Sequence, residues 1–445
     1  MKIRGSMKVR TRALVLTTLL TLAIPLVPAQ AQQPLHKKQP PFYAVTDLGT
    51  LGGAFGVARG LNSRSWTVGG ANVSENAATH AFLWRDGLTS DLGTFGGTNS
   101  LAFALNLNGQ VAGQAESPVP DPFGVDFCFN RTQLQCLPFL WQNGVMTSLP
   151  TLGGNNGIAN GINDMGVVSG QAENSTFDST CGSPKYESKP VLWKDGVAQE
   201  LPNWVGDPDG YVWGINNNGQ AVGASGPCLT ENAPLHALLW HNDTVTDLGN
   251  LGGDFYAEAF AINDRGQVVG SSDVPGDTFA GPYSTAHGFL WKNGKNRDLG
   301  TIPGDAGSFA IALNNQGQAV GLGSRAIIWQ DGGLWDLNTL VPGEPFSPLY
   351  LLGAFDINDR GEIVGIGLAI NGERHAFLAT PCSDVENCKA SGPALLAVDP
   401  IGMATANPRN AAVGGVLGRM LDRFHTRRFW GYQFPSSATR PLKQR

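Results

Sequence analysis

The stretch DLGNLGGDFYAEAFAINDRGQVVGSSDVPGDTFAGPYSTAHGFLWKNG, residues 247 to 294, contains the pattern that decides the fold. Within it, AFAIN (259–263) and QVVG (267–270) are short runs of small, apolar and β-branched residues, which are typical of buried strands. The intervening Asn263 to Gly266 favours a tight turn, because Asn can bond to its own backbone and Gly tolerates positive φ. A third strand at GFLW (288–291) and a fourth strand from Arg297 complete a predicted four-stranded antiparallel sheet.

Imperfect copies of this unit fill the chain from residue 43 to 380. The turn asparagine recurs at intervals of 44 to 57 residues, at Asn62, Asn106, Asn163, Asn216, Asn263, Asn314 and Asn358. The end of the third strand carries Trp in six copies, namely Trp84, Trp141, Trp193, Trp240, Trp291 and Trp329. Repeats of this length are typical of propellers and arrays, because a single four-stranded sheet buries its two apolar faces only against neighbours. We expect the tryptophans to pack between blades.

The two ends of the repeat region distinguish a closed ring from an open stack. The region begins with a lone fourth strand, YAVTDLG (43–49), and its last copy stops after a third strand at Thr380. Together these parts complete one sheet. We therefore predict an all-β fold, a seven-bladed β-propeller of four-stranded antiparallel blades over residues 43–381, with the ring closed by the N-terminal strand. A β-solenoid is the alternative, although its coils are usually shorter than this repeat.

These motifs resemble the bacterial HAF extracellular repeat family. The resemblance is carried by DLGTLGG at 47–53, by near copies at 91–97 and 247–253, and by the triplet HAF at 80–82 and 375–377. It covers about three quarters of the chain and implies a secreted or surface-exposed repeat protein, without established catalytic residues. The third and fourth units depart from the pattern, with SLPTLGG (148–154) and ELPNWVG (200–206) in place of the acidic motif.

The segments outside the repeats indicate a secreted protein. Residues 1–31 combine five cations, an apolar run and a small-x-small site at Ala29 to Ala31, which is typical of a secretory signal peptide. We expect an extracellular or periplasmic location, a disordered leader at 32–42, and no transmembrane segment in the mature chain. Residues 382–445 are predicted to be a basic, mostly disordered tail with a possible short helix at 413–424.

The charge balance disfavours two classes of partner. Residues 32–408 contain 17 Lys and Arg against 35 Asp and Glu, a formal charge of −18. A negative surface of this kind repels nucleic acid and anionic lipid. The expected partner is an extracellular polysaccharide or a surface protein, and the chain is expected to be a monomer.

Six cysteines in a secreted chain predict disulfides. From their positions in insertions of the repeats and after the last strand, we predict the pairs Cys128 with Cys136, Cys181 with Cys228, and Cys382 with Cys388.

No cofactor or metal site is predicted. His80, His236, His287 and His375 occupy one position of the repeat, but they lie on separate blades and cannot share an ion. We expect them to form hydrogen bonds at a strand edge or between blades. The Asn-Asp turns lack the string of oxygen ligands of a calcium loop. The motifs GxxxxGK[ST], GxSxG, HExxH and CxxC do not occur in the sequence.

Candidate ligand-binding residues lie where the copies differ. The irregular connections of units four and five contain aromatic side chains beside carboxylates, a combination used in carbohydrate and peptide grooves: Trp204, Asp207, Asp209, Tyr211, Asp254, Tyr256 and Glu258. Long insertions between the second and third strands of units two to five add Phe123, Phe127, Phe129, Phe177, Tyr186, Phe279 and Tyr283. The alternative is that these aromatic residues only pack their own loops onto the blades.

Two functions fit these observations. The first is a secreted, non-catalytic binding or structural propeller that engages an extracellular polysaccharide or protein. The second is a secreted propeller-fold glycoside hydrolase or polysaccharide lyase, with its acid and base among Asp207, Asp209, Asp254 and Glu258.

Overall fold

The computed structural model describes residues 39–178, 185–227, 234–242, 244–276, 285–342 and 347–391. All of them belong to one compact unit, Lys38–Arg445. The predicted signal peptide, most of the leader and the possible helix at 413–424 lie outside the described residues, as do Cys181, Cys228, Phe279 and Tyr283. Among the described residues, no helix has both the length and the hydropathy needed to cross a membrane.

The described strands pair antiparallel into groups of four, which we number as blades 1 to 7. Six groups consist of consecutive strands, and the seventh combines the last three strands with the first. Blade 1 contains β2 (Gly52–Leu61), β3 (Thr67–Val73), β4 (Thr79–Arg85) and β5 (Leu88–Gly93). Blade 2 contains β6 (Ser100–Leu105), β7 (Val111–Pro120), β8 (Leu134–Gln142) and β9 (Val145–Ser148). Blade 3 contains β10 (Gly153–Ile162), β11 (Val168–Phe177), β12 (Tyr186–Lys194) and β13 (Val197–Glu200). Blade 4 contains β14 (Asp209–Ile215), β15 (Ala221–Gly226), β16 (His236–His241) and β17 (Thr244–Asp247). Blade 5 contains β18 (Ala257–Ile262), β19 (Val268–Ser272), β20 (His287–Lys292) and β21 (Lys295–Asp298). Blade 6 contains β22 (Phe309–Leu313), β23 (Ala319–Leu322), β24 (Ala326–Gln330) and β25 (Gly333–Asp336). Blade 7 contains β26 (Leu349–Ile357), β27 (Ile363–Ala369), β28 (Arg374–Cys382) and β1 (Phe42–Gly49). The helical segments are η1 (Ser74–Asn76), η2 (Leu337–Leu340) and α1 (Val385–Ser391).

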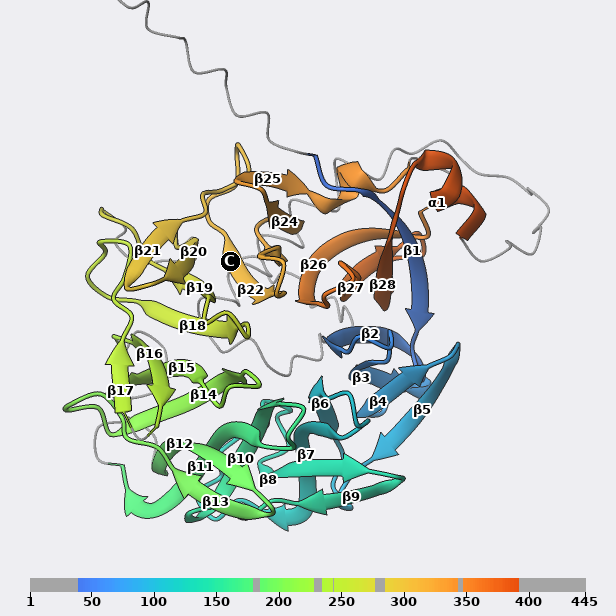
Figure 1. Cartoon of the computed structure of the whole chain (residues 1–445). Helices are drawn as coiled ribbons and strands as arrows, with labels where there is room; N and C mark the ends of the chain where they lie inside the picture. Colours follow the sequence, from blue (N-terminus) through green and yellow to red (C-terminus); the bar gives the residue numbers. More distant parts are fainter. Residues whose placement is uncertain are drawn as a thin grey trace, which may run out of the picture. The chain divides into compact units, whose positions relative to one another are not determined.

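This arrangement is a β-propeller, as predicted. The blades follow one another around a centre, and the first strand of each blade lies nearest that centre (Figure 1). First strands of neighbouring blades contact each other around the whole ring, including β26 and β2. Because strands alternate in direction, the first-to-second and third-to-fourth turns lie on one face. The long insertions and the connections between blades lie on the other face.

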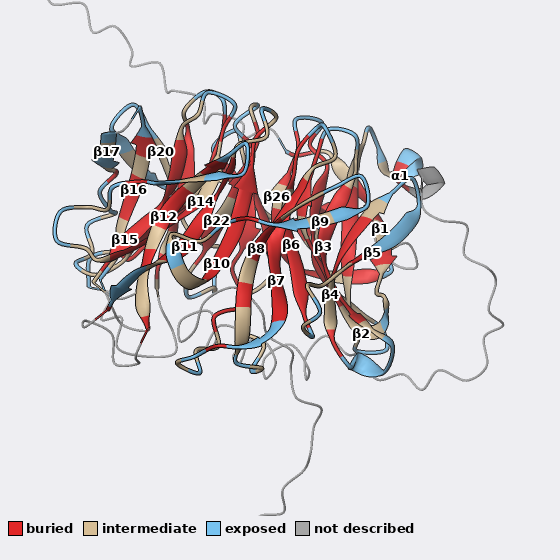
Figure 2. Cartoon of the chain, turned by 90° about the horizontal axis from the view of Figure 1, so that it is seen from below, coloured by how far each residue is buried: buried red, intermediate tan, exposed pale blue. Residues whose placement is uncertain are grey.

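The core of this unit lies between the blades. Buried strand residues form a continuous band, and the loops at its two edges are exposed (Figure 2). As predicted, each of the six repeat tryptophans packs in a cluster shared with the preceding blade. Three of them also donate the indole N–H to a carbonyl of the connection leaving that blade; for example, Trp240 Nε1 bonds to the Pro202 oxygen at 2.6 Å.

The first strand of the unit closes the ring. β1 pairs antiparallel with β28, from Phe42 opposite Cys382 to Gly49 opposite Ala376. β1 therefore takes the outermost place in blade 7, as the incomplete repeats at the two ends predict. The propeller strands extend over residues 42–382, one residue beyond the predicted boundary at each end.

The repeated turn asparagines form a second closure, near the centre. In each turn the Asn side-chain oxygen accepts from its own turn, as Asn263 Oδ1 does from the Arg265 and Gln267 amides at 3.1 and 3.0 Å. The Nδ2 group donates to the backbone oxygen of the turn asparagine in the next blade, at 2.9 to 3.1 Å, in all seven blades. The last of these bonds joins Asn358 to Asn62. We call this closed set of seven bonds the asparagine belt.

Every first strand contains a β-bulge three residues before its turn asparagine. The ladder with the second strand skips one residue there, at Arg59, Phe103, Asn160, Trp213, Phe260, Ile311 and Phe355. A glycine of the second strand faces each bulge, and an added Cβ would lie 1.8 to 2.2 Å from a first-strand carbonyl oxygen. The final Gly of the QVVG motif, Gly270 in blade 5, is therefore required by the bulge.

Candidate functional site

The candidate site centres on Glu258, near the start of β18. Five residues before the turn asparagine, the other blades carry apolar or aromatic residues or glycine: Val57, Leu101, Ile158, Tyr211, Phe309 and Gly353. Glu258 is the only carboxylate in this position and is 8% exposed. Buried carboxylates require hydrogen-bond donors, so the surroundings of Glu258 must provide them.

Three aromatic side chains supply those donors. The Tyr211 hydroxyl donates to Glu258 Oε1 at 2.6 Å, and Trp213 Nε1 donates to the same oxygen. The Tyr256 hydroxyl donates to Oε2 at 2.8 Å. Burial, together with the charge of Glu258, raises the pKa of Tyr256 above its usual value, so this hydroxyl remains a donor at neutral pH. We call Glu258 with Tyr211, Trp213 and Tyr256 the Glu258 cluster.

One bulge holds Trp213 of this cluster, and the next holds the ring of Phe260 beside it. Trp213 and Phe260 occupy the bulge positions of β14 and β18, and their ring centroids lie 6.4 Å apart. The rings of Tyr211 and Trp213 pack edge to face at 5.2 Å. Trp213, Tyr256 and Phe260 are half-buried. The first strands of blades 4 and 5 thus present aromatic surface around one held carboxylate.

The structure brings together Tyr211, Tyr256 and Glu258 of the predicted site but separates the other four residues from them. Asp209 is fully buried, where it accepts from Lys185 Nζ at 2.7 Å and from the Ser188 amide at 2.8 Å. Asp207 Oδ2 accepts from Ser225 Oγ at 2.6 Å and contacts His236 Nδ1 at 2.9 Å.

Trp204 and Asp254 complete the predicted set. Trp204 packs against the cluster between blades 3 and 4, and its ring lies 6.3 Å from that of His236. Asp254 is exposed on the connection leading to β18. Trp204 therefore contributes to packing, and Asp254 lies outside the Glu258 cluster.

This arrangement does not favour two-carboxylate chemistry. Glycoside hydrolysis by an acid and a base needs two carboxyl groups on either side of one bond, with one able to give its proton to the leaving group. Asp207, Asp209 and Glu258 are each held by donors in different surroundings. A carboxylate fixed by several donors is suited to binding and orientation.

Insertion aromatics of blade 2 pack on their own loop and on the neighbouring blade 3. Phe127 is buried with Phe103, Ile158 and the Cys128–Cys136 pair. Phe123 contacts Tyr186 of the next insertion edge to face at 5.1 Å and Phe177 at 6.3 Å. For these residues the packing alternative fits, although Phe177 keeps 54% of its surface exposed.

The repeated histidines have a structural role within blades. His80 and His287 bond through Nδ1 to the fourth-strand aspartates Asp91 and Asp298 at 2.8 Å. His375 makes the same contact with Asp47 of β1 across the ring closure. In these three pairs the expected hydrogen bonding at a strand edge is confirmed, because the aspartate lies on the adjacent strand. His236 instead contacts Asp207, which lies on the connection between blades 3 and 4.

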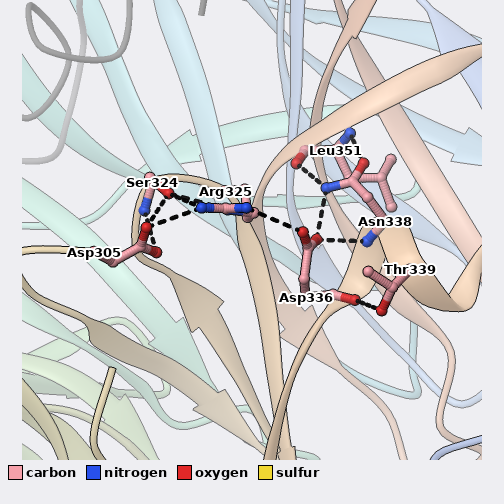
Figure 3. Close-up of polar contacts among 7 residues, drawn as sticks. All are labelled: Asp305, Ser324, Arg325, Asp336, Asn338, Thr339 and Leu351. Carbon is pink, nitrogen blue, oxygen red and sulfur yellow. Dashed lines mark hydrogen bonds and ion pairs between the residues drawn. The ribbon is translucent and has the colours of Figure 1, made fainter. Parts of the chain in front are cut away.

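Blade 6 replaces this histidine with Arg325. Its guanidinium contacts Asp305 at 2.9 Å and Asp336 at 3.4 Å (Figure 3). Asp336 also caps η2 through the Asn338 amide at 2.9 Å, and the Asn338 side chain bonds to both backbone groups of Leu351 in β26. Arg325 thus helps to join blades 6 and 7.

Two predicted disulfides are present, Cys128–Cys136 and Cys382–Cys388, with Cα separations of 5.3 and 5.4 Å. The predicted Cys181–Cys228 pair lies outside the described residues. Within the described ranges, no group of three His, Cys, Asp or Glu side chains is placed to hold a metal ion.

Sequence reasoning missed Trp213 and Phe260. Aligning the copies on the turn asparagine would have shown that both occupy the position three residues before it. Nothing in a single copy reveals that a bulge turns this position toward the ring centre. The same alignment identifies Glu258, because it shows an acidic residue at a position that is uncharged in the other six repeats.

No protein-family model and no curated protein matches the sequence. Solved structures similar to this chain include the WD40 β-propeller domain of Doa1, with 13% identity, a TM-score of 0.36, and coverage of 75% of this chain and 96% of that one. A gluconolactonase from Xanthomonas campestris has 10% identity, a TM-score of 0.35 and coverage of 78% and 96%. The Aleuria aurantia lectin has 9% identity, a TM-score of 0.33 and coverage of 76% and 99%. These likenesses concern the fold and indicate no activity for this chain.

Proposed function

We propose that this chain is a secreted, non-catalytic propeller that binds an extracellular polysaccharide or a surface protein through the Glu258 cluster and the adjoining ring of Phe260. The observation that carries the proposal is the set of half-buried aromatic rings around a fixed carboxylate on the first strands of blades 4 and 5. Aromatic surface with a few oriented polar groups is the usual composition of a ligand site.

Two further features support this proposal. The first strands begin at the face that carries the long insertions, so the Glu258 cluster lies near the more elaborate face of the ring. The Cys128–Cys136 disulfide in one of these insertions fits an oxidising compartment outside the cytoplasm.

The proposal is tested with the mature chain on an array of polysaccharides and glycans. We expect Trp213→Ala and Tyr256→Phe to weaken retention at least about tenfold, since each removes a contact of the central site. The matched control for the hydroxyl is Tyr43→Phe, because Tyr43 is buried in the outermost strand of blade 7 and its hydroxyl makes no hydrogen bond in the described part of the chain.

Trp204→Ala serves as a packing control. Trp204 packs between blades 3 and 4, so we expect its substitution by Ala to lower the melting temperature. Retention that is unchanged in both site variants would reject the Glu258 cluster as the binding site. Turnover of any arrayed glycan would reject the non-catalytic role.

A further inference from the structure

We propose that a cavity between blades 5 and 6 binds one acidic sugar residue of a polysaccharide, with the sugar carboxylate on Arg297. We call it the Arg297 cavity. It includes residues of both hairpin turns of blade 6, so it lies at the face that carries the turns. The Glu258 cluster lies near the opposite face, which carries the long insertions, and the two sites are therefore separate.

The Arg297 cavity has a volume of about 230 Å³ and lies between the last two strands of blade 5 and the hairpins of blade 6. Its apolar lining includes Leu290, Leu299, Leu313 and Trp329, which belong to the core cluster between these two blades. The Trp329 indole donates to the Leu299 oxygen at 3.0 Å, which fixes this ring in the wall. The volume lies between the roughly 150 Å³ that encloses one benzene ring and the roughly 300 Å³ at which sites for larger ligands begin, so it suits one sugar ring.

Three cations lie on the face of blade 5 that is turned toward this cavity. Arg297 lies opposite Leu290, and Lys295 lies opposite Lys292, in the pairing of β20 with β21. Side chains that are opposite each other, or two apart along a strand, share one face of a sheet. Leu290 and Arg297 line the cavity, so Lys292 and Lys295 continue the same face toward the hairpin turn. We call Lys292, Lys295 and Arg297 the basic edge.

The basic edge is particular to blade 5. At the three equivalent positions every other blade has at most one Lys or Arg, namely Arg85 in blade 1 and Lys194 in blade 3. The propeller fold therefore does not require these cations. All three are exposed, and their concentration in one blade indicates an anionic ligand.

No carboxylate of the described residues neutralises the basic edge. Described carboxylates pair with other cations, such as Lys189 and Arg325, and none pairs with the basic edge. Asp298 also lines the cavity, but it lies opposite Phe289, so its side chain is on the other face of blade 5. There its oxygens contact His287 Nδ1 at 2.8 Å and the Gly300 amide at 2.7 Å.

Blade 6 adds polar groups at the mouth of the cavity. Gln330 and Asp331 belong to the turn between β24 and β25, where Gln330 Nε2 lies 3.4 Å from Asp331 Oδ2. Gln330 Oε1 accepts from Gln318 Nε2 at 2.7 Å, which orients the Gln330 amide. A guanidinium binds a carboxylate through two parallel hydrogen bonds, and a carboxylate such as Asp331 accepts from hydroxyls. A uronic acid offers an apolar ring face, hydroxyls and a carboxylate, and so matches all three parts of the cavity.

The charge of the whole repeat region restricts the ligand further. Its formal charge of −18 over residues 32–408 repels a polymer that is charged at every unit. At physiological salt this repulsion is screened beyond about 8 Å, whereas a carboxylate in the cavity lies against the basic edge. The favoured ligand is therefore a largely neutral polysaccharide that contains isolated uronic acids.

The test compares methyl glucuronide with methyl glucoside, which share a ring and differ in one carboxylate. Titration of the mature chain at neutral pH, followed by NMR, should show at least about tenfold tighter binding of the glucuronide. Arg297→Gln introduces the residue type that blade 3 carries at this position, Gln199, and should reduce the preference to less than about threefold. Lys194→Gln is the matched control, because it removes an exposed cation from the position of Lys292 in blade 3, and it should leave the preference intact.

Equal affinity of the wild-type chain for the two glycosides would overturn the inference, and this comparison needs no variant to fold. A preference that persists in Arg297→Gln, or that Lys194→Gln loses to the same extent, would also overturn it, because the Arg297 cavity would not be its source. If a glutamate-rich peptide binds and methyl glucuronide does not, the ligand is an acidic protein and the acidic-sugar class is wrong. None of these measurements depends on the Glu258 cluster, so rejection of one site leaves the other in place.

Discussion

At the scale of single residues, four charged side chains of first strands stand out, because the other repeats have uncharged residues at the same position relative to the turn asparagine. These are Arg59, Asp209, Glu258 and Asp356. Asp356 accepts from the Leu61 and Ile357 amides at 2.7 and 2.8 Å, and burial raises its pKa to about 6. Burial lowers the pKa of Arg59 to about 9. The fold of a repeat protein depends on the residues that its repeats share. Charged residues at positions where the other repeats are uncharged are therefore the ones to examine for binding and for pH dependence.

Glu173 gives the clearest pH prediction. It is buried in blade 3, where burial raises its pKa from 4.5 to about 7 despite bonds from Asn155 and Asn156. The folded state holds this proton more tightly than the unfolded state, so the free energy of unfolding should fall as pH rises from about 4.5 to 7. Asp356 should add a change of the same sign between about 4 and 6.

The measurement is denaturant unfolding across this pH range. A shift of this size corresponds to a loss on the order of 3 kcal/mol by the upper end of the range. Glu173→Gln should remove the slope between about pH 6 and 7 and leave the contribution of Asp356 below about pH 6, because Gln does not titrate and keeps an acceptor. Glu200→Gln, at an exposed position of β13, should leave the slope unchanged. A wild-type stability that rises with pH over this interval would contradict the assignment.

At the scale of elements, the turns, the strands and the tryptophan packing followed from the sequence, and the bulges did not. The turn at Asn263 is determined by an Asn and a Gly within four residues. Trp recurs at the position of Trp291 in six repeats, which is too regular for a surface role. A bulge is an offset in the pairing of two strands. Its position therefore depends on the register between the strands, which the sequence of one strand does not show. Tyr211, Tyr256 and Glu258 were therefore found as unusual residues, whereas Trp213 and Phe260 required the three-dimensional register.

The bulge explains why two glycines of blade 5 should respond differently to alanine. At Gly270 an added Cβ would lie 2.0 Å from the Glu258 carbonyl oxygen, so the strands must move apart. At Gly294 the space is open and the cost comes only from a φ of +76°. We expect Gly270→Ala to cost about 3 kcal/mol or more and Gly294→Ala about 1 kcal/mol. Thermal and denaturant unfolding measure both; equal costs would mean that blade 5 tolerates separation of its first two strands.

At the scale of the whole propeller unit, the ring is closed at two radii. On the outside, β1 completes blade 7, and Asp47 of β1 bonds to His375 at 2.8 Å. Near the centre, the asparagine belt passes from Asn358 to Asn62 with the same geometry as at every other junction. The junction between blades 7 and 1 therefore has the same belt contact as the other junctions, although the first and last strands of the repeat region meet in blade 7.

This equivalence can be tested by removing the belt bond at two junctions. Asn358→Ala breaks the bond to Asn62 at the chain closure, and Asn263→Ala breaks the bond to Asn314 inside the chain. Each also removes two acceptor contacts within its own turn and one Nδ2 donor contact, from Asn263 to Gln267 Oε1 at 2.9 Å and from Asn358 to Glu362 Oε2 at 2.6 Å. Because the lost contacts match in number and differ only in that one acceptor is a carboxylate, we expect both substitutions to cost about 1 to 3 kcal/mol and to agree within about 1 kcal/mol by denaturant unfolding. If the junction between blades 7 and 1 opens in solution, the belt bond there is already broken in part of the population, and Asn358→Ala would cost clearly less than Asn263→Ala.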